Sequence, residues 1–228
     1  MTVEDQKRLA GEAAALRVES GMVVVLGTGS TAAWFVKALA ARGLHGLRCV
    51  PTSEKTADLA RDLGLTLSTL DDTPRIDLTV DGADEIGPGL ALIKGGGAAL
   101  LREKLVWEAS ASCIVIADAA KVVKMLGAFH LPIEVVAFGH KTTANRIADV
   151  LLDHEIVMPA RARMADRGLV RTDGGNLIYD ARCVSIHDPV RLADDLKLIT
   201  GVVEHGLFLD LADEAIVGGD DGVESLLP

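Results

Sequence analysis

Apolar residues in the first half of the chain form short continuous runs separated by longer repeats at helical spacing. Over residues 3–19, Leu9, Ala13 and Leu16 recur among charged positions, which predicts an amphipathic helix that ends before Gly21. The apolar run at 22–26 predicts a buried strand, followed by a helix over 32–41 and a strand at 47–50. The chain is therefore predicted to open with a helix and then a unit of strand, loop, helix and strand.

The alternation of strands and helices continues to about residue 117. We expect a helix over 53–63, a strand at 77–80, a helix over about 97–110 and a strand at 113–117. These strands are short and apolar without polar alternation, as in parallel sheets covered by helices on both faces. The predicted fold class is α/β, with a mostly parallel sheet.

The pattern changes near residue 128, where hairpin and turn signals mix with the strands. A strand at 131–138, a helix over 142–152 and a strand at 176–180 predict a small α+β domain. We expect the segments 206–211 and 215–217 to return to the first sheet. The predicted domains are residues 1–128 with 207–228, and residues 129–206.

Composition and charge exclude several classes of protein. The 228 residues are 49% hydrophobic and 25% charged, so the chain can bury a core and is not disordered. The net charge of −10 has the wrong sign for binding nucleic acid through the overall field of the protein. An anionic ligand must therefore be held by local groups.

The cysteines and the N-terminal residues indicate in which cellular compartment the protein is expected. Cys49, Cys113 and Cys183 are far apart and form no C-x-x-C motif, so we expect neither disulfides nor a zinc site. The polar N-terminus lacks the order of a signal peptide, and polar residues interrupt the longest uncharged run, at 21–36. We expect a soluble, cytoplasmic protein without a membrane partner.

A glycine-rich loop joins the first predicted strand to the helix over 32–41. It reads Gly27, Thr28, Gly29, Ser30 and Thr31. Backbone N–H groups and the helix dipole converge on an anion at such a position. A dinucleotide site would also need an acid after the next strand, which ends here in Cys49, Val50 and Pro51. The two hydroxyls favour a phosphate monoester; the alternative is an ordinary tight turn in which Ser30 caps the helix.

Acidic residues follow the strand predicted at 77–80. The segment Asp81, Gly82, Ala83, Asp84 and Glu85 places three carboxylates at the carboxyl edge of the sheet, where open α/β folds bind ligands. A solvated acidic turn is the alternative. A divalent-metal site is a further one, but no histidine lies near and such a site usually needs a third oxygen ligand.

Lys94 precedes three consecutive glycines, Gly95, Gly96 and Gly97. Such a run is entropically costly and indicates that the backbone approaches another group closely. The lysine would neutralise nearby acids and could stabilise negative charge that develops on a substrate oxygen. A flexible surface turn is the alternative.

The helix expected over 97–110 places a carboxylate among apolar residues. Glu103 shares helical spacing with Leu100, Val106 and Trp107. A partly desolvated carboxylate suits proton transfer, although a glutamate at such a place often snorkels or pairs with a lysine. We interpret Lys104 and Glu108 as an exposed i,i+4 pair.

Other polar residues carry weaker signals. Lys7 and Lys121 are of interest for their positions, and the alternative for each taken alone is a solvated surface charge. The six histidines show no spacing typical of metal ligands, and no serine sits in a nucleophile elbow.

Taken together, these motifs resemble the type A family of ribose-5-phosphate isomerases. The resemblance rests on the order and spacing of the motifs at 27–31, 81–85, 94–100 and 102–104. It extends to the segments 51–53, 172–176, 201–208 and 221–223, and so covers essentially the whole chain. Gly174 and Leu101 depart from the family pattern, at positions that carry no expected catalytic group.

The resemblance implies an aldose-ketose isomerase of the non-oxidative pentose phosphate pathway. It would interconvert D-ribose 5-phosphate and D-ribulose 5-phosphate through an enediolate, without metal or organic cofactor. The implied fold is a Rossmann-like α/β domain with a smaller α+β domain, assembled as a homodimer or homotetramer.

The resemblance also implies roles for individual residues. Glu103 would be the base that moves a proton between C2 and C1, and Asp81, Asp84 and Lys94 would complete the catalytic set. The roles of Asp81 and Asp84 in ring opening stay undivided. The substrate-binding residues would be Lys7, Thr28, Gly29, Ser30, Thr31, Asp81, Gly82, Ala83, Asp84, Lys94, Gly95, Gly96, Gly97 and Lys121.

Two other function classes share this kind of fold. A sugar-phosphate-sensing module of a transcription regulator would normally be joined to a basic DNA-binding region and would not need Glu103. An amino-sugar-phosphate deaminase is expected to use a histidine in ring opening, and no histidine lies between Asp81 and Glu103. Both stay as alternatives to the isomerase at this point.

Overall fold

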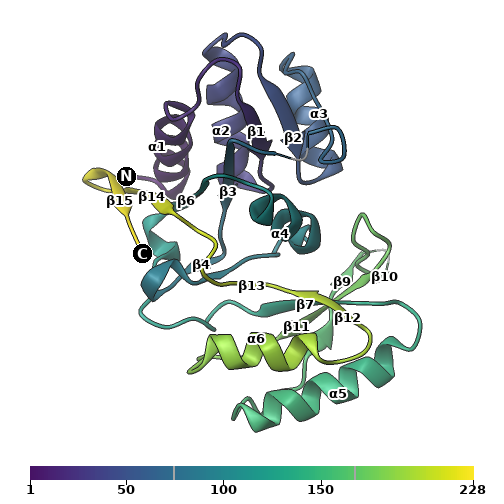
Figure 1. Cartoon of the computed structure of the whole chain (residues 1–228). Coiled ribbons are helices and arrows are strands. Elements are labelled where there is room, and N and C mark those ends of the chain that lie inside the picture. Colours follow the sequence, from purple (N-terminus) through teal and green to yellow (C-terminus); the bar gives the residue numbers. More distant parts are fainter. Residues whose placement is uncertain (74, 167) are drawn as a thin grey trace. The chain divides into compact units, whose positions relative to one another are not determined.

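The computed structural model describes residues 1–73, 75–166 and 168–228 (Figure 1). Contacts along the backbone divide the chain into two compact units. Unit 1 consists of Met1–Ala83, Arg102–Val122 and Asp210–Pro228, and unit 2 of Asp84–Leu101 and Val123–Leu209.

Unit 1 is built on a six-stranded sheet in the order β15, β14, β6, β3, β1, β2. Five of its strands are parallel, and β15 runs antiparallel at one edge. The bounds are β1 (Val23–Leu26), β2 (Arg48–Pro51), β3 (Leu78–Gly82), β6 (Cys113–Asp118), β14 (Glu214–Gly219) and β15 (Gly222–Leu226). β1 and β6 are buried along their whole length, and apart from Asp118 at the end of β6 their sequences are apolar without alternation.

Helices lie on both faces of this sheet, which confirms the predicted α/β class. They are α1 (Val3–Ala15), α2 (Ser30–Ala41), α3 (Glu54–Asp62), α4 (Leu100–Glu108) and the short 3₁₀ helix η2 (Ala119–Lys121). Leu78 and Val80 of β3 pack in one apolar cluster with residues of α1 and α2. Thr79 points to the opposite face, where its Oγ1 lies 2.6 Å from Oγ of Ser110, just after α4.

Unit 2 contains a four-stranded antiparallel sheet in the order β12, β7, β11, β8 and a three-stranded sheet in the order β13, β5, β4. Helices α5 (His140–Asp153) and α6 (Pro189–Lys197) pack on each other, and α6 packs on β12 (Figure 1). The other bounds are β4 (Glu85–Ile86), η1 (Pro88–Leu90), β5 (Leu92–Ile93), β7 (Leu131–Val135), β8 (Arg161–Ala162), β9 (Met164–Ala165), β10 (Gly168–Leu169), β11 (Leu177–Ala181), β12 (Val202–His205) and β13 (Leu207–Phe208).

The motif at 172–176 has a structural role in unit 2. Thr172 Oγ1 and Asn176 Nδ2 each donate to Oε1 of the buried Glu134, at 2.9 Å. Gly174 lies in this turn, and a Cβ there would meet nothing nearer than 3.6 Å.

Two predictions from the sequence are wrong, one about the sheet that the segment 206–211 joins and one about where the strand at 131–138 ends. The segment 206–211 does not return to the first sheet: β13 pairs with β5 in unit 2, whereas β14, which contains 215–217, joins the sheet of unit 1. Gly206 makes the first pairing possible, because a Cβ there would lie 2.2 Å from the carbonyl oxygen of Lys94. The strand expected at 131–138 ends at Val135, since the chain turns toward α5 through Gly139 in the left-handed region (φ 68°).

Candidate active site

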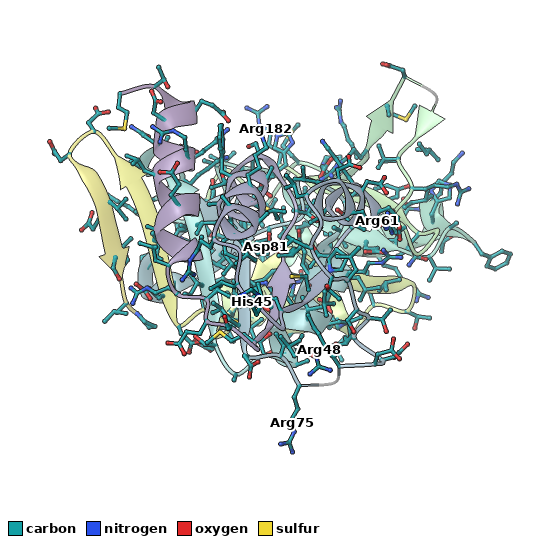
Figure 2. The ribbon with its side chains drawn as sticks, turned by 90° about the horizontal axis from the view of Figure 1, so that it is seen from above. His45, Arg48, Arg61, Arg75, Asp81 and Arg182 are labelled. Carbon is teal, nitrogen blue, oxygen red and sulfur yellow. The ribbon has the colours of Figure 1, made fainter. Side chains whose placement is uncertain are left out.

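The loop between β1 and α2 meets the end of β3 at the carboxyl edge of the unit 1 sheet. In the strand order, β1 lies between β2 and β3, so the chain reverses direction across the sheet at this point. The crevice outside such a reversal is where open α/β sheets bind ligands. Asp81, labelled in Figure 2, belongs to β3 and is fully buried.

Asp81 fastens the glycine-rich loop to β3. Its Oδ1 accepts the N–H of Thr28 at 3.0 Å and the N–H of Gly82 at 2.7 Å. Gly27 is a glycine because there is no space for a side chain: a Cβ there would lie 2.1 Å from Oδ1 of Asp81. These contacts fix the orientation of the Asp81 carboxylate.

A chain of hydroxyl groups holds the other side of the same loop. Thr28 Oγ1 lies 2.7 Å from Oγ1 of Thr52 and donates to Oγ of Ser53 at 2.9 Å. Thr56 Oγ1 donates to the carbonyl oxygen of Gly27 at 3.0 Å. The hydroxyl of Thr28 is therefore used to build the loop, and it ties the motif at 51–53 to the motif at 27–31.

Ser30 and Thr31 differ from Thr28 in this respect. Ser30 is exposed and Thr31 is partly buried, and neither hydroxyl forms a hydrogen bond with the residues that the structure describes. The alternative in which Ser30 caps α2 is wrong, because Gly29 is the N-cap, with φ at 119°, and Ser30 is the first helical residue. The start of α2 thus presents two hydroxyls beside backbone N–H groups that have no helical acceptor.

Lys7 and Lys121 belong to the same edge of unit 1. The backbone carbonyl of Gln6 lies so close to Gly218 that a Cβ there would be 2.0 Å from its oxygen. Gly218 pairs in register with Asp118 of β6, and η2 with Lys121 follows directly. Both lysines therefore stand near the carboxyl ends of β14 and β6. Lys7 lies 3.8 Å from the carboxylate of Glu4.

Glu103 is buried in α4, with 3% of its surface exposed. Val106 and Trp107, one turn further along the helix, are buried as well. The expected apolar stripe is present, whereas the interpretation of Lys104 as half of an exposed pair is wrong: Lys104 is 9% exposed and only Glu108 faces solvent. Leu105 takes the exposed position instead, so the helix is less regularly amphipathic than its sequence indicates.

Asp84 and the lysine with its three glycines belong to unit 2. Lys94 is 2% exposed, and its Nζ lies 5.4 Å from the centre of the Phe208 ring. Asp84 accepts the N–H of Gly96 at 2.8 Å. The loop is thus held by specific contacts, which argues against a flexible surface turn.

Glu85 takes no part in the candidate site. Its Oε2 accepts the N–H of Gly127 at 2.7 Å and its Oε1 accepts the N–H of Phe129 at 2.5 Å. The residue is 3% exposed and fixes the loop at 127–129 in unit 2. Its assignment to a row of three ligand-binding carboxylates is therefore wrong.

Arg163 and Asp180 were missed by the sequence analysis. Arg163 donates to the carbonyl oxygens of Gly95 and Gly96 and pairs with Asp180. No local motif marks either residue, because the contact joins segments 67 residues apart in the chain.

The described residues contain neither a cluster of metal ligands nor a helix that could span a membrane. Among residues 1–73, 75–166 and 168–228, no group of three or more His, Cys, Asp or Glu side chains could hold a metal ion. No helix in this part of the chain is long and apolar enough to cross a membrane.

Comparison with known proteins identifies the family. The sequence model of ribose 5-phosphate isomerase A (phosphoriboisomerase A) matches residues 48–222. A ribose-5-phosphate isomerase A from Caulobacter vibrioides is 68% identical over the full length of both chains. The chain belongs to the ribose 5-phosphate isomerase A family.

Other members of the family extend this result. A relative from Parvibaculum lavamentivorans is 50% identical, with 98% of both chains covered. A solved D-ribose-5-phosphate isomerase in complex with phospho-erythronic acid superposes over all of both chains with a TM-score of 0.93 at 40% identity. The enzyme from Methanocaldococcus jannaschii gives a TM-score of 0.91 at 36% identity, again over all of both chains. The predicted family is confirmed.

Family membership decides between the function classes left open by the sequence. The chain is an isomerase that interconverts ribose 5-phosphate and ribulose 5-phosphate, a reaction of the pentose phosphate pathway. Neither the sugar-phosphate-sensing module nor the amino-sugar-phosphate deaminase is favoured.

Proposed function

We propose that this ribose 5-phosphate isomerase works through an enediolate, with Glu103 as the base that moves a proton between C2 and C1 of the sugar. The burial of Glu103 in α4, with 3% of its surface exposed, carries this assignment. A carboxylate shielded from water is less solvated and therefore a better acceptor for a carbon-bound proton. Glutamate also suits a shuttle, because the same oxygen can return the proton to the neighbouring carbon.

Lys94 stabilises the negative charge that forms on the substrate oxygen as the enediolate develops. A cation buried against the ring of Phe208 acts in a medium of low polarity, where its field is less screened than in water. Asp84, whose carboxylate is held by the N–H of Gly96, binds the sugar with Ala83, Gly82 and the glycines at 95–97. In this scheme the protein's own groups supply the stabilisation of the oxyanion.

Asp81 moves the hydroxyl proton that must be transferred when the furanose ring opens. The bonds from Thr28 and Gly82 hold its carboxylate in one orientation, as a positioned acid or base requires. We assign ring opening to Asp81 rather than to Asp84 because Asp81 is fully buried at the strand reversal.

The phosphate is held at the start of α2. Ser30 and Thr31 offer hydroxyls, Gly29 allows the backbone to approach, and the N-terminus of the 12-residue helix favours an anion. Lys7 and Lys121 add positive charge from the carboxyl ends of β14 and β6. Binding energy from this non-reacting end orients the sugar for proton transfer.

A pair of aspartate variants tests this assignment. Asp81 lies in β3 and Asp77 immediately precedes that strand; Asp81 accepts the N–H of Thr28 and Asp77 that of Val23, the latter at 2.7 Å. Asp81→Asn should lower kcat for conversion of ribose 5-phosphate to ribulose 5-phosphate by about 10²-fold. Asp77→Asn, at the amino end of β3, is the matched control and should retain kcat. Equal kcat values in both folded variants would remove Asp81 from the mechanism.

We also infer that the chain acts as a homodimer or homotetramer in the cytoplasm. Large apolar side chains on unit 2 support self-association, among them Phe138 at 93% exposure and Leu198 at 82%. The three scattered, buried thiols support a reducing compartment. Light scattering on the purified chain tests the first point: a mass of one chain at micromolar concentration would contradict it.

A further inference from the structure

Arg163 grips the glycine loop that follows Lys94. Its Nη1 donates to the carbonyl oxygen of Gly95 at 3.1 Å and to that of Gly96 at 2.9 Å. The rest of the guanidinium pairs with both carboxylate oxygens of Asp180, Nε at 2.8 Å and Nη2 at 2.5 Å. One side chain therefore joins the loop to strand β11.

The four-stranded sheet of unit 2 fixes the backbone of Arg163 and its partner Asp180. β8 pairs with β11, and the backbone N–H of Arg163, the residue after β8, donates to the carbonyl oxygen of Ile178 at 2.8 Å. The side chains of Arg163 and Asp180 are 17% and 19% exposed. A charge-assisted, two-point pair of this kind holds one geometry, which a lysine cannot reproduce.

The loop itself needs such support. Gly95 has φ at 105° and Ala98 has φ at 59°, so a residue with a side chain occupies the left-handed region just before α4. A conformation of that kind costs free energy and persists where the surroundings fix it. Neighbouring groups close in from other sides, since a Cβ at Gly95 would lie 2.9 Å from Cδ2 of Leu100.

The direction of the Arg163 bonds determines where the loop's N–H groups point. In a trans peptide the C=O and the next N–H point in opposite directions. The Gly95 carbonyl faces Arg163, and the Gly96 N–H of the same peptide accordingly donates to Asp84. By the same geometry, the Gly96 carbonyl faces Arg163 and the Gly97 N–H is directed away from it. That N–H has no acceptor among the described residues.

We propose that Arg163, fixed by Asp180, is a positioning residue for isomerisation: it orients the peptides at 95–97 so that the Gly97 N–H and Asp84 face the substrate. The inference rests on the proposed role of the segment 94–97 at the reacting sugar. It adds to that role the group that holds the segment in place.

The expected effect on kcat and KM depends on which end of the substrate an Arg163 variant disturbs. A misplaced loop disturbs the reacting sugar, whereas the phosphate contacts at Ser30 and Thr31 belong to another loop. Arg163→Gln should therefore lower kcat by about tenfold to 10²-fold with KM changed by less than about threefold. A loss of folded protein alone would lower the active fraction, leaving kcat per folded molecule unchanged.

Arg171 supplies the matched control. Its Nη1 also donates to a glycine carbonyl in unit 2, that of Gly175 at 2.9 Å, in a turn outside the proposed site. Arg171→Gln should keep kcat within about twofold. Arg163→Lys keeps the charge, but its three N–H donors cannot serve all four oxygens that Arg163 bonds, so its kcat should also fall. This variant and Asp180→Asn keep the test decisive if Arg163→Gln fails to fold.

All kcat values are to be measured per folded molecule, well below each variant's melting temperature. A wild-type value of kcat in any folded Arg163 variant would overturn the positioning role. An inactive wild-type chain would instead contradict the proposed function itself, so the two failures are distinguishable.

Discussion

Asp81 fills the space that a side chain at Gly27 would need: a Cβ at Gly27 would lie 2.1 Å from Oδ1 of Asp81 and 2.6 Å from its Cα. The carboxylate is thereby brought against the loop backbone and accepts the N–H of Thr28. The proposed phosphate-binding loop and the proposed ring-opening group are thus fixed to each other.

Gly27→Ala should therefore damage both stability and catalysis. The added methyl group would displace Asp81, and overpacking of this kind costs about 1–3 kcal/mol of unfolding free energy. We expect a lower denaturation midpoint together with a lower kcat for ribose 5-phosphate. Gly174→Ala is the control, because a Cβ there meets nothing nearer than 3.6 Å. Equal midpoints for the two variants would show that the Gly27 site relaxes without strain.

Removal of the hydroxyls of Ser30 and Thr31 should weaken substrate binding without unfolding the protein. Neither hydroxyl bonds to another described residue, so nothing inside the chain loses a partner. Hydrogen bonds to a charged group contribute about 1.5–3 kcal/mol, so KM should rise by about tenfold or more in Ser30→Ala/Thr31→Ala, and inhibition by inorganic phosphate should weaken.

Thr28→Val is the contrasting variant for that prediction. Thr28 bonds to Thr52 and Ser53, so its loss should lower the denaturation midpoint. If the double variant kept the wild-type KM, the loop would be an ordinary turn and not a phosphate site.

The sequence predicts some parts of this molecule well for physical reasons that are local. Continuous apolar runs predicted β1 and β6, since strands buried on both faces need no polar alternation. The helical spacing around Glu103 predicted its burial. Both signals lie within a few neighbouring residues.

Contacts between distant segments could not be predicted in this way. Two-residue strands such as β4, β5 and β13 carry no period, and Arg163 reaches Gly96 only through the pairing of β8 with β11. The burial of Lys104 likewise depends on what packs on α4 and not on its own spacing. Helix α6 was not among the predicted elements, although its sequence carries a local signal: Asp188 is the N-cap and Pro189 lies in the first turn.

Activity should survive exhaustive treatment with a chelator. Carboxylates of the acidic segment at 81–85 accept hydrogen bonds from the backbone: Asp84 accepts the N–H of Gly96, and both oxygens of Glu85 accept backbone N–H groups. The measurement is turnover of ribose 5-phosphate after prolonged incubation with EDTA and gel filtration. Loss of turnover that only an added divalent ion restores would contradict the proposed mechanism.

The thiols should be unreactive in the folded protein. Burial raises the pKa of Cys49 to about 11 and that of Cys183 to about 12, so at pH 8 no more than about one Cys49 thiol in a thousand is ionised. A thiol reagent should label these two residues only after denaturation, as peptide mass spectrometry would show. Rapid native labelling of either would contradict their burial.

The raised pKa values of the two thiols also predict that the free energy of unfolding falls at high pH. Because the folded-state pKa of each thiol lies above the unfolded value of 9.0, the folded state keeps its protons longer. The stabilising contribution is complete below pH 9 and is lost as pH rises from there through about 11 for Cys49 and about 12 for Cys183. Cys49→Ala/Cys183→Ala should show a shallower fall in unfolding free energy across this range; equal slopes would contradict the assignment.

The most direct test concerns Glu103, the proposed base for carbon-bound protons. Glu103→Gln keeps size and hydrogen-bonding capacity but removes the basic oxygen, so folding and substrate binding should persist while turnover falls by about 10²-fold to 10⁴-fold. Glu108→Gln, on the exposed face of the same helix, should leave turnover unchanged. In heavy water the wild type should incorporate deuterium into the sugar during isomerisation, to the extent that the base exchanges its proton before returning it, and Glu103→Gln should lose that incorporation together with turnover. A folded Glu103→Gln protein that isomerises ribose 5-phosphate at the wild-type rate would contradict the account and return the role of base to Asp81 or Asp84.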